Sequence, residues 1–186
     1  MREPALMTVI GAKGTGKTYT TRKELAAQVK RGRKVLIYDA SLDPELSHYR
    51  PIAPDYIQEY AFYKGPAIVR VPAIDKHGNE LATSEKVELL KQILQSYRNG
   101  ILLLEDFNKY VTDATELKEL LGVITTNRHK NLDIILHYQS LRAVYTRIFQ
   151  NSTIFRMHKD LESSGHVQRA LERQIRAFQD SFFNYR

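Results

Sequence analysis

The sequence predicts a three-layer α/β domain with a mainly parallel central sheet, and three observations lead to that prediction. Short apolar stretches alternate with amphipathic stretches of helical period along most of the 186 residues. Two of the apolar stretches, 101–104 ("ILLL") and 134–136 ("IIL"), contain no polar residue, as is typical of strands buried on both faces. A glycine-rich turn joins the first apolar stretch to the first amphipathic one. Alternating strands and helices form right-handed crossovers and a sheet covered on both sides.

The predicted elements of the first half follow from apolar runs and from residues that end them. Apolar runs predict strands, the inward-facing Leu25, Ala26 and Val29 predict a helix, and Gly32 predicts the end of that helix. Residues 41–66, rich in Pro, Asp and Tyr, are expected to be irregular. In chain order we expect a strand at 6–10, a helix at 17–31, strands at 34–39 and 67–71, and a turn at 75–80.

The second half repeats the alternation of helix and strand. Thr83 or Ser84 is expected to cap a helix that ends at Gly100, and Asp113 with Glu116 resembles a capping box at the start of another. The remaining expected elements are strands at 101–106 and 132–139, a short helix, the segment 152–158, and a final helix with a stripe of Val167, Leu171, Ile175 and Phe178.

Length and composition restrict the class of protein. The length suits one domain, 1–186, with a core over about 6–160 and a C-terminal helix and aromatic tail over about 161–186. No apolar run could cross a bilayer and the N-terminus does not have the layout of a signal peptide, so we expect no membrane span and a cytoplasmic location. Absence of cysteine excludes disulfides and thiol chemistry, and the six histidines lack metal-ligand spacing. The net charge of +7 fits either an ordinary basic surface or a polyanionic partner such as nucleic acid.

The stretch from Gly11 to Thr18 ("GAKGTGKT") matches the phosphate-binding pattern G-x-x-x-x-G-K-[ST] between a predicted strand and a predicted helix. Glycines let successive N–H groups approach phosphate oxygens, and the helix N-terminus adds partial positive charge. We expect ATP or GTP binding, with Lys17 on the β- and γ-phosphates and Thr18 on Mg²⁺. Lys13 either touches a phosphate or is a solvated loop lysine. The candidate nucleotide-binding residues are Gly11, Ala12, Lys13, Gly14, Thr15, Gly16, Lys17, Thr18 and Tyr19.

Four further residues are candidates for the hydrolytic chemistry. Glu105 and Asp106 end an apolar strand, where one carboxylate can hold Mg²⁺ and the other can orient the attacking water. By position Glu105 takes the magnesium role, but the pair stands in the reverse of the usual Asp–Glu order, so the two roles remain exchangeable. Gln139 would face the γ-phosphate if its strand lies between the acidic strand and the loop strand. Arg128 is either a cation at a helix C-terminus or an arginine finger that reaches a neighbouring subunit.

These motifs together resemble the FtsK–HerA superfamily of DNA-pumping ATPases. The resemblance covers roughly residues 6–160, and the compact size of the chain is similar to that of viral genome-packaging ATPases. It implies a RecA-like (ASCE) P-loop core, a homohexameric ring, ATP hydrolysis with Mg²⁺, and translocation of DNA, with a capsid or portal-vertex protein as a further partner. The segments that carry it are "GAKGTGKT", "ILLLED", the arginine of "NRHKN", "IILHYQS" and "IFQNSTIFRMHK".

Several basic and aromatic residues remain open to two interpretations. Arg169, Arg173 and Arg176 form a helical stripe that is either a solvated face or a phosphate-tracking surface. The tail 178–186 is expected to dock on its own core or on a partner. The residues that follow Gln139 and could serve as subunit contacts or fingers are Arg142, Arg147 and Arg156.

The leading functional hypothesis is an ATP-driven DNA translocase that packages a viral or mobile-element genome. The alternatives are a small-molecule or nucleotide kinase and a non-motor DNA-binding ATPase of the helicase-loader type. A kinase is expected to carry an arginine-bearing lid, and the sequence between Asp106 and Gln139 shows none.

Overall fold

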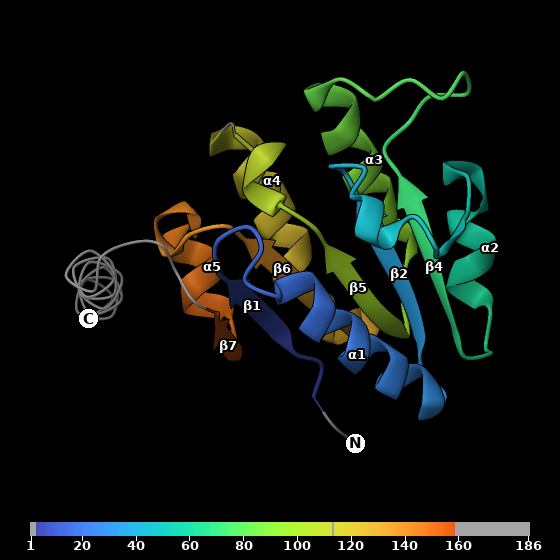
Figure 1. Cartoon of the computed structure of the whole chain (residues 1–186), viewed down its shortest axis with the longest axis horizontal. Coiled ribbons are helices and arrows are strands. Elements are labelled where there is room, and N and C mark those ends of the chain that lie inside the picture. The colour runs from blue at the N-terminus through green and yellow to red at the C-terminus, as the bar shows by residue number, and fades with distance from the viewer. Residues whose placement is uncertain (1–2, 113, 159–186) are drawn as a thin grey trace.

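A seven-stranded sheet forms the centre of the protein, whose computed structural model describes residues 3–112 and 114–158 (Figure 1). Every strand pairing in it is parallel. The strand order is β3-β4-β2-β5-β6-β1-β7. The strands are β1 (Leu6–Ile10), β2 (Lys34–Asp39), β3 (Arg50–Pro51), β4 (Ala67–Pro72), β5 (Gly100–Leu104), β6 (Leu132–Tyr138) and β7 (Ile154–Met157).

Helices cover both faces of this sheet, which confirms the predicted three-layer α/β class. Helix α1 (Lys17–Lys30) lies on one face, where its Leu25 packs in a buried cluster with Val9, Ile37 and Leu103. The other face carries α2 (Ile57–Phe62), α3 (Thr83–Ser96), α4 (Ala114–Thr125) and α5 (Thr146–Asn151), whose buried side chains join one large core cluster.

The position of β6 matters most for function, because β6 lies between β5 and β1. Leu104 of β5 pairs with Leu136, and Val9 of β1 pairs with His137. The carboxyl ends of the acidic strand, the glutamine strand and the phosphate-loop strand therefore meet at one edge of the sheet. The strand before Gln139 thus lies between the acidic strand and the loop strand, which was the condition for Gln139 to face the γ-phosphate.

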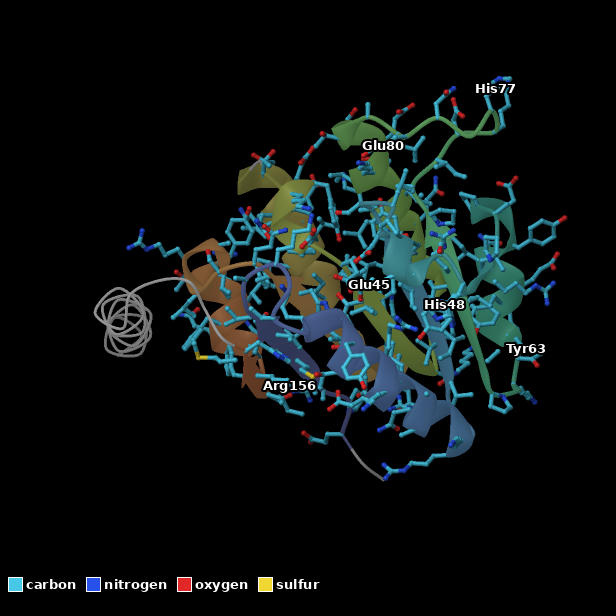
Figure 2. All side chains as sticks on the ribbon, viewed as in Figure 1. Glu45, His48, Tyr63, His77, Glu80 and Arg156 are labelled. Atoms are coloured by element: carbon cyan, nitrogen blue, oxygen red, sulfur yellow. The ribbon has the colours of Figure 1, made fainter. Side chains whose placement is uncertain are left out.

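Two local predictions need correction. The N-cap of α3 is Ala82 rather than Thr83 or Ser84, because the Glu85 side chain accepts the Ala82 N–H at 2.8 Å and so caps the helix from inside its first turn. The stretch 41–66 is not wholly irregular, since it contains β3, α2 and two 3₁₀ turns, η1 (Pro44–Leu46) and η2 (Pro54–Tyr56). The turn at 75–80 is present, with His77 at the tip of its loop and Glu80 nearer to α3 (Figure 2).

Some predicted features lie outside the described residues. These are Asp113 of the expected capping box, the final helix with its arginine stripe, and the aromatic tail 178–186. Within the described parts of the chain, no helix is both long and apolar enough to cross a bilayer.

Candidate functional site

The glycine-rich loop connects the end of β1 to the start of α1, and its backbone needs glycine at three positions. Gly14 and Gly16 have φ values of 78° and 85°, which residues with a Cβ rarely adopt. A Cβ on Gly11 would lie 2.7 Å from the Cβ of His158 and 2.9 Å from Thr15 Oγ1. The loop thus keeps a tight path that brings backbone N–H groups to the N-terminus of α1, where anions bind.

Lys17 lies buried at the first position of α1, with its ammonium group turned back onto the loop. Its Nζ donates to the carbonyl oxygens of Gly11 and Ala12, the second at 3.1 Å, and Thr15 Oγ1 donates to the same Ala12 oxygen at 2.7 Å. Phosphate oxygens are stronger acceptors for an ammonium group than amide carbonyls. The arrangement therefore suits a lysine that exchanges loop carbonyls for a triphosphate.

An open pocket of about 520 Å³ lies over the loop and the carboxyl ends of β5 and β6. Its wall brings most of the sequence-predicted site residues together. Gly11, Ala12 and Thr15 are not among its lining residues, and the first two of them are buried. The lining residues are Lys13, Gly14, Gly16, Lys17, Thr18, Tyr19, Ser41, Asp43, Pro44, Glu45, Glu105, Asp106, Lys109 and Gln139.

Tyr19 and Lys13 form the exposed part of that wall. The Tyr19 side chain is 57% exposed, and the Lys23 ammonium group lies 4.4 Å from the centroid of its ring. Lys13 is also exposed, so both interpretations of this lysine stay open.

Glu105 is the buried member of the acidic pair, on the face of the sheet that α1 covers. Only 4% of the residue is exposed. Its Oε2 lies 3.0 Å from His137 Nδ1, whereas its Oε1 is buried without a hydrogen-bond partner. A buried carboxylate oxygen that the described protein leaves unpaired is a site for a donor or a cation.

Asp106 has a different environment, although it is the next residue. Its backbone is left-handed, with φ 47°, and its carboxylate accepts from Gln139 Nε2 at 3.1 Å and from Ser41 Oγ at 3.3 Å. Lys109 forms an ion pair with it. Burial raises the pKa of Asp106, but the hydrogen bonds from Lys109 and Gln139 and the charges of Lys109 and Lys17 outweigh burial and hold the pKa below its ordinary value.

Arg128 is not brought to this pocket. It belongs to a 3₁₀ turn, η4 (Asn127–Lys130), that precedes the amino end of β6, whereas the pocket lies at the carboxyl end. The seven residues of β6 separate the two ends by about 20 Å. Arg156 is also engaged within its own chain, because it donates from β7 to Glu24 of α1 at 2.8 Å (Figure 2).

The residues present fit a magnesium ion that is held mainly by phosphate oxygens. Within the described residues no group of three or more His, Cys, Asp or Glu side chains could hold a metal by itself. Thr18 and Glu105 both line the pocket, and Glu105 Oε1 is a buried carboxylate oxygen without a hydrogen-bond partner among the described residues. One hydroxyl and one carboxylate are the protein contribution expected when a nucleotide supplies the other ligands.

Sequence reasoning missed His137, Lys109 and Ser41. His137 could have been found, because it stands two residues before Gln139 in the strand predicted at 132–139, where alternate residues share one face of the sheet. Lys109 stands three residues after Asp106, which is the spacing of an ion pair on a helical turn. Ser41 reaches Asp106 from 65 residues away and carries no local signal.

Comparisons with known proteins bear on the fold. No protein-family model and no curated protein sequence matches the chain. The genome packaging NTPase B204 from Sulfolobus turreted icosahedral virus 2, in complex with AMP, is similar with a TM-score of 0.65 and 15% identity, over 95% of this chain and 85% of B204. The chain has the three-layer, RecA-like fold of P-loop ATPases. Its similarity to B204 in complex with ATP-gammaS has a TM-score of 0.65 at 17% identity, over 94% of this chain and 84% of B204.

The cytoplasmic domain of EssC is a second, more distant neighbour. It has a TM-score of 0.57 and 11% identity, and the similarity covers 86% of this chain but 34% of that one. At these identities the likeness shows a shared fold.

Proposed function

We propose that this protein is an ATP-hydrolysing DNA translocase that packages a viral or mobile-element genome as a homo-oligomeric ring. The observation that carries the proposal is the placement of Gln139, Glu105 and Asp106 at one edge of the sheet, around the pocket of the phosphate loop. A lysine, two carboxylates and a glutamine around one triphosphate are the groups needed to move its γ-phosphate to water.

Five residues of the pocket have a role in that reaction. Lys17 binds the β- and γ-phosphates, and Thr18 with Glu105 orients Mg²⁺, which when bound neutralises the charge of these phosphates. Asp106 and Gln139, which are hydrogen-bonded to each other, position the attacking water. The lowered pKa of Asp106 keeps its carboxylate ionised near neutral pH, so it can accept a hydrogen bond from that water and orient it.

Packaging of DNA is supported by two observations outside the pocket. B204, which has the same fold over most of its length, is a genome packaging NTPase. The net charge of +7 suits a polyanion such as double-stranded DNA. The kinase alternative receives no support from the segment between β5 and β6, because its described part consists of α4, packed between α3 and α5, and the short turns η3 (Phe107–Lys109) and η4, without a lid over the pocket.

A ring gives Arg128 its role. Because Arg128 lies at the opposite edge of the sheet from its own pocket, it would act on the γ-phosphate of a neighbouring subunit. Hydrolysis would then depend on assembly, as in ATPases whose arginine finger acts in trans. In this proposal the ring is a hexamer and docks on a capsid or portal-vertex protein.

The central test is the ATPase rate and the oligomeric state of the full chain, each measured with and without double-stranded DNA. We expect ATP to drive assembly of hexamers and DNA to raise the rate of hydrolysis. A monomer that transfers phosphate to a small acceptor, or an ATPase indifferent to DNA, would contradict the translocase.

The shared site has its own test in mixtures of variants. We expect Arg128→Ala to bind ATP normally and to lose hydrolysis, because the finger is missing from every interface. Mixing it with Lys17→Ala should restore part of the activity, since some interfaces then join an intact loop to an intact arginine. Full activity of Arg128→Ala alone would place the finger elsewhere.

A further inference from the structure

A buried chain of hydrogen bonds links helix α1 to the acidic strand through His137. The imidazole is 0% exposed. Its Nδ1 lies 3.0 Å from Glu105 Oε2, and its Nε2 lies 2.9 Å from Thr21 Oγ1. Three elements that surround the pocket, α1, β6 and β5, are thus connected by one side chain.

The fold places this histidine by register. His137 follows Leu136, which pairs with Leu104 of β5, so the imidazole stands beside Glu105. On its other side it pairs with Val9 of β1, two residues before the phosphate loop begins. Thr21 is four residues after Lys17 and faces the sheet from the next turn of α1.

The donor and acceptor roles within the chain follow from the chemistry of Glu105. An ionised carboxylate can only accept, so Nδ1 carries the proton and donates to Oε2. In the neutral ring Nε2 then accepts from the hydroxyl of Thr21. Glu105 is held by one oxygen, and its other oxygen, Oε1, has no partner within the described protein.

The neighbouring Asp106 has no such unpartnered carboxylate oxygen. Both of its oxygens are in use, Oδ1 by Gln139 and Oδ2 by Ser41 and Lys109. Of the two carboxylates at the end of β5, Glu105 is the one with a buried oxygen still available to a ligand.

We propose that His137 is the positioning residue that fixes Glu105 for magnesium, leaving Oε1 available to the ion or to one of its waters. This inference rests on the proposed function, because it concerns the Mg²⁺–ATP complex of the same pocket. Holding a glutamate rotamer before the ion arrives removes part of the ordering cost from binding. Residues that orient metal ligands typically contribute about 10- to 100-fold in metal affinity or activity.

Two substitutions of similar polarity separate the two hydrogen bonds of the ring. His137→Asn places an amide where Nδ1 stands and keeps a donor for Glu105, whereas His137→Gln extends the amide toward Nε2 and keeps a partner for Thr21. The readout is the affinity for ATP-gammaS with and without Mg²⁺, measured on the full chain. We expect the gain in affinity from Mg²⁺ to survive in His137→Asn and to fall about tenfold in His137→Gln.

The affinity without Mg²⁺ and the thermal unfolding midpoint are the controls, and both should be alike in the two variants. A histidine that merely fills space would give two variants with equal magnesium dependence, and that result would overturn the proposal. So would a wild-type protein whose affinity for ATP-gammaS does not respond to Mg²⁺.

A second pair of variants serves if the buried histidine cannot be replaced without unfolding. Thr21→Val removes the hydroxyl that holds Nε2, and Thr21→Ser retains it. We expect the magnesium gain to fall severalfold in Thr21→Val and to return in Thr21→Ser, and equal gains would contradict the chain of hydrogen bonds. Because ATP-gammaS binding is measured, a wild type that binds Mg²⁺–ATP-gammaS but ignores DNA would refute the translocase without touching this test.

Discussion

The two halves of the sheet both bury charged side chains, but they satisfy them differently. In the β2–β4 half, Lys34 and Asp39 are 4% and 0% exposed. Lys34 Nζ donates to the carbonyl oxygens of Tyr60, at 3.1 Å, and Ala61, at the end of α2. Asp39 accepts from Arg70 and from the N–H of Asp43, each at 2.9 Å. Fixed groups of the protein therefore satisfy both charges.

In the β5–β6–β1 half, equally buried charges are left with capacity for a ligand. Among the described residues, Glu105 Oε1 has no hydrogen-bond partner, and Lys17 donates to loop carbonyls that a phosphate can replace. Burying a charge is unfavourable in both halves, so the halves differ in which groups, protein or ligand, can offset that cost. In the β2–β4 half the charged groups hold other parts of the fold in place, whereas Glu105 and Lys17 line a pocket whose ligand can bind to them.

Of the substitutions considered, Lys17→Ala should have the largest effect on ATP hydrolysis. We expect kcat for ATP hydrolysis to fall about 1000-fold, because the ammonium group no longer stabilises charge on the γ-phosphate. The free energy of unfolding should not fall, since the substitution removes a buried charge that only a nucleotide uses fully. Steady-state hydrolysis and urea unfolding measure the two effects. Turnover at the wild-type rate would refute the phosphate-loop assignment.

Asp106→Asn should have the next largest effect. We expect kcat to fall about 100-fold with little change in the magnesium dependence, because the asparagine keeps its place beside Gln139 but accepts no proton. Glu105→Gln should instead shift the magnesium dependence. Asp55→Asn, an exposed carboxylate on η2, is the matched control and should change neither. If Asp106→Asn and Glu105→Gln behave in opposite order, the two carboxylates exchange roles.

In both halves the sequence predicted the strands and the phosphate loop better than the features that depend on distant contacts. The bounds of β1 and β2 follow from apolar runs, and the glycine loop has an unambiguous pattern. Helix α2 has six residues and too few local hydrogen bonds to be stable alone, so it depends on Lys34 from β2 and escaped prediction. His137 escaped for a similar reason, because its partners Glu105 and Thr21 are 32 and 116 residues away along the chain.

Lys34→Met tests whether the buried charge of the β2–β4 half serves stability rather than activity. The substitution leaves the carbonyl oxygens of Tyr60 and Ala61 without their donor, and we expect the free energy of unfolding to fall by about 1–3 kcal/mol. The kcat for ATP hydrolysis should stay at the wild-type value, because Lys34 lies at the amino end of β2, away from the pocket. Lys30→Met, at an exposed position near the end of α1, is the control. An unchanged free energy of unfolding would mean that the hydrogen bonds of Lys34 to Tyr60 and Ala61 do not stabilise the fold.

The smallest expected effect is the pH dependence of the contribution that Lys34 makes to the free energy of unfolding. Burial and then the charge of Arg98 lower the pKa of Lys34 below 10.5. Between the lowered pKa and 10.5 the folded protein binds fewer protons at this group than the unfolded chain, so its contribution to stability rises with pH. Comparing urea midpoints of wild type and Lys34→Met at several alkaline pH values cancels the titration of the buried tyrosines. We expect the advantage of the wild type to grow as pH approaches 10.5, since deprotonation relieves the cost of burial while Nζ can still donate. An advantage that shrinks would show that Lys34 is stabilised in its charged form, and the two halves of the sheet would then differ less than their hydrogen bonds indicate.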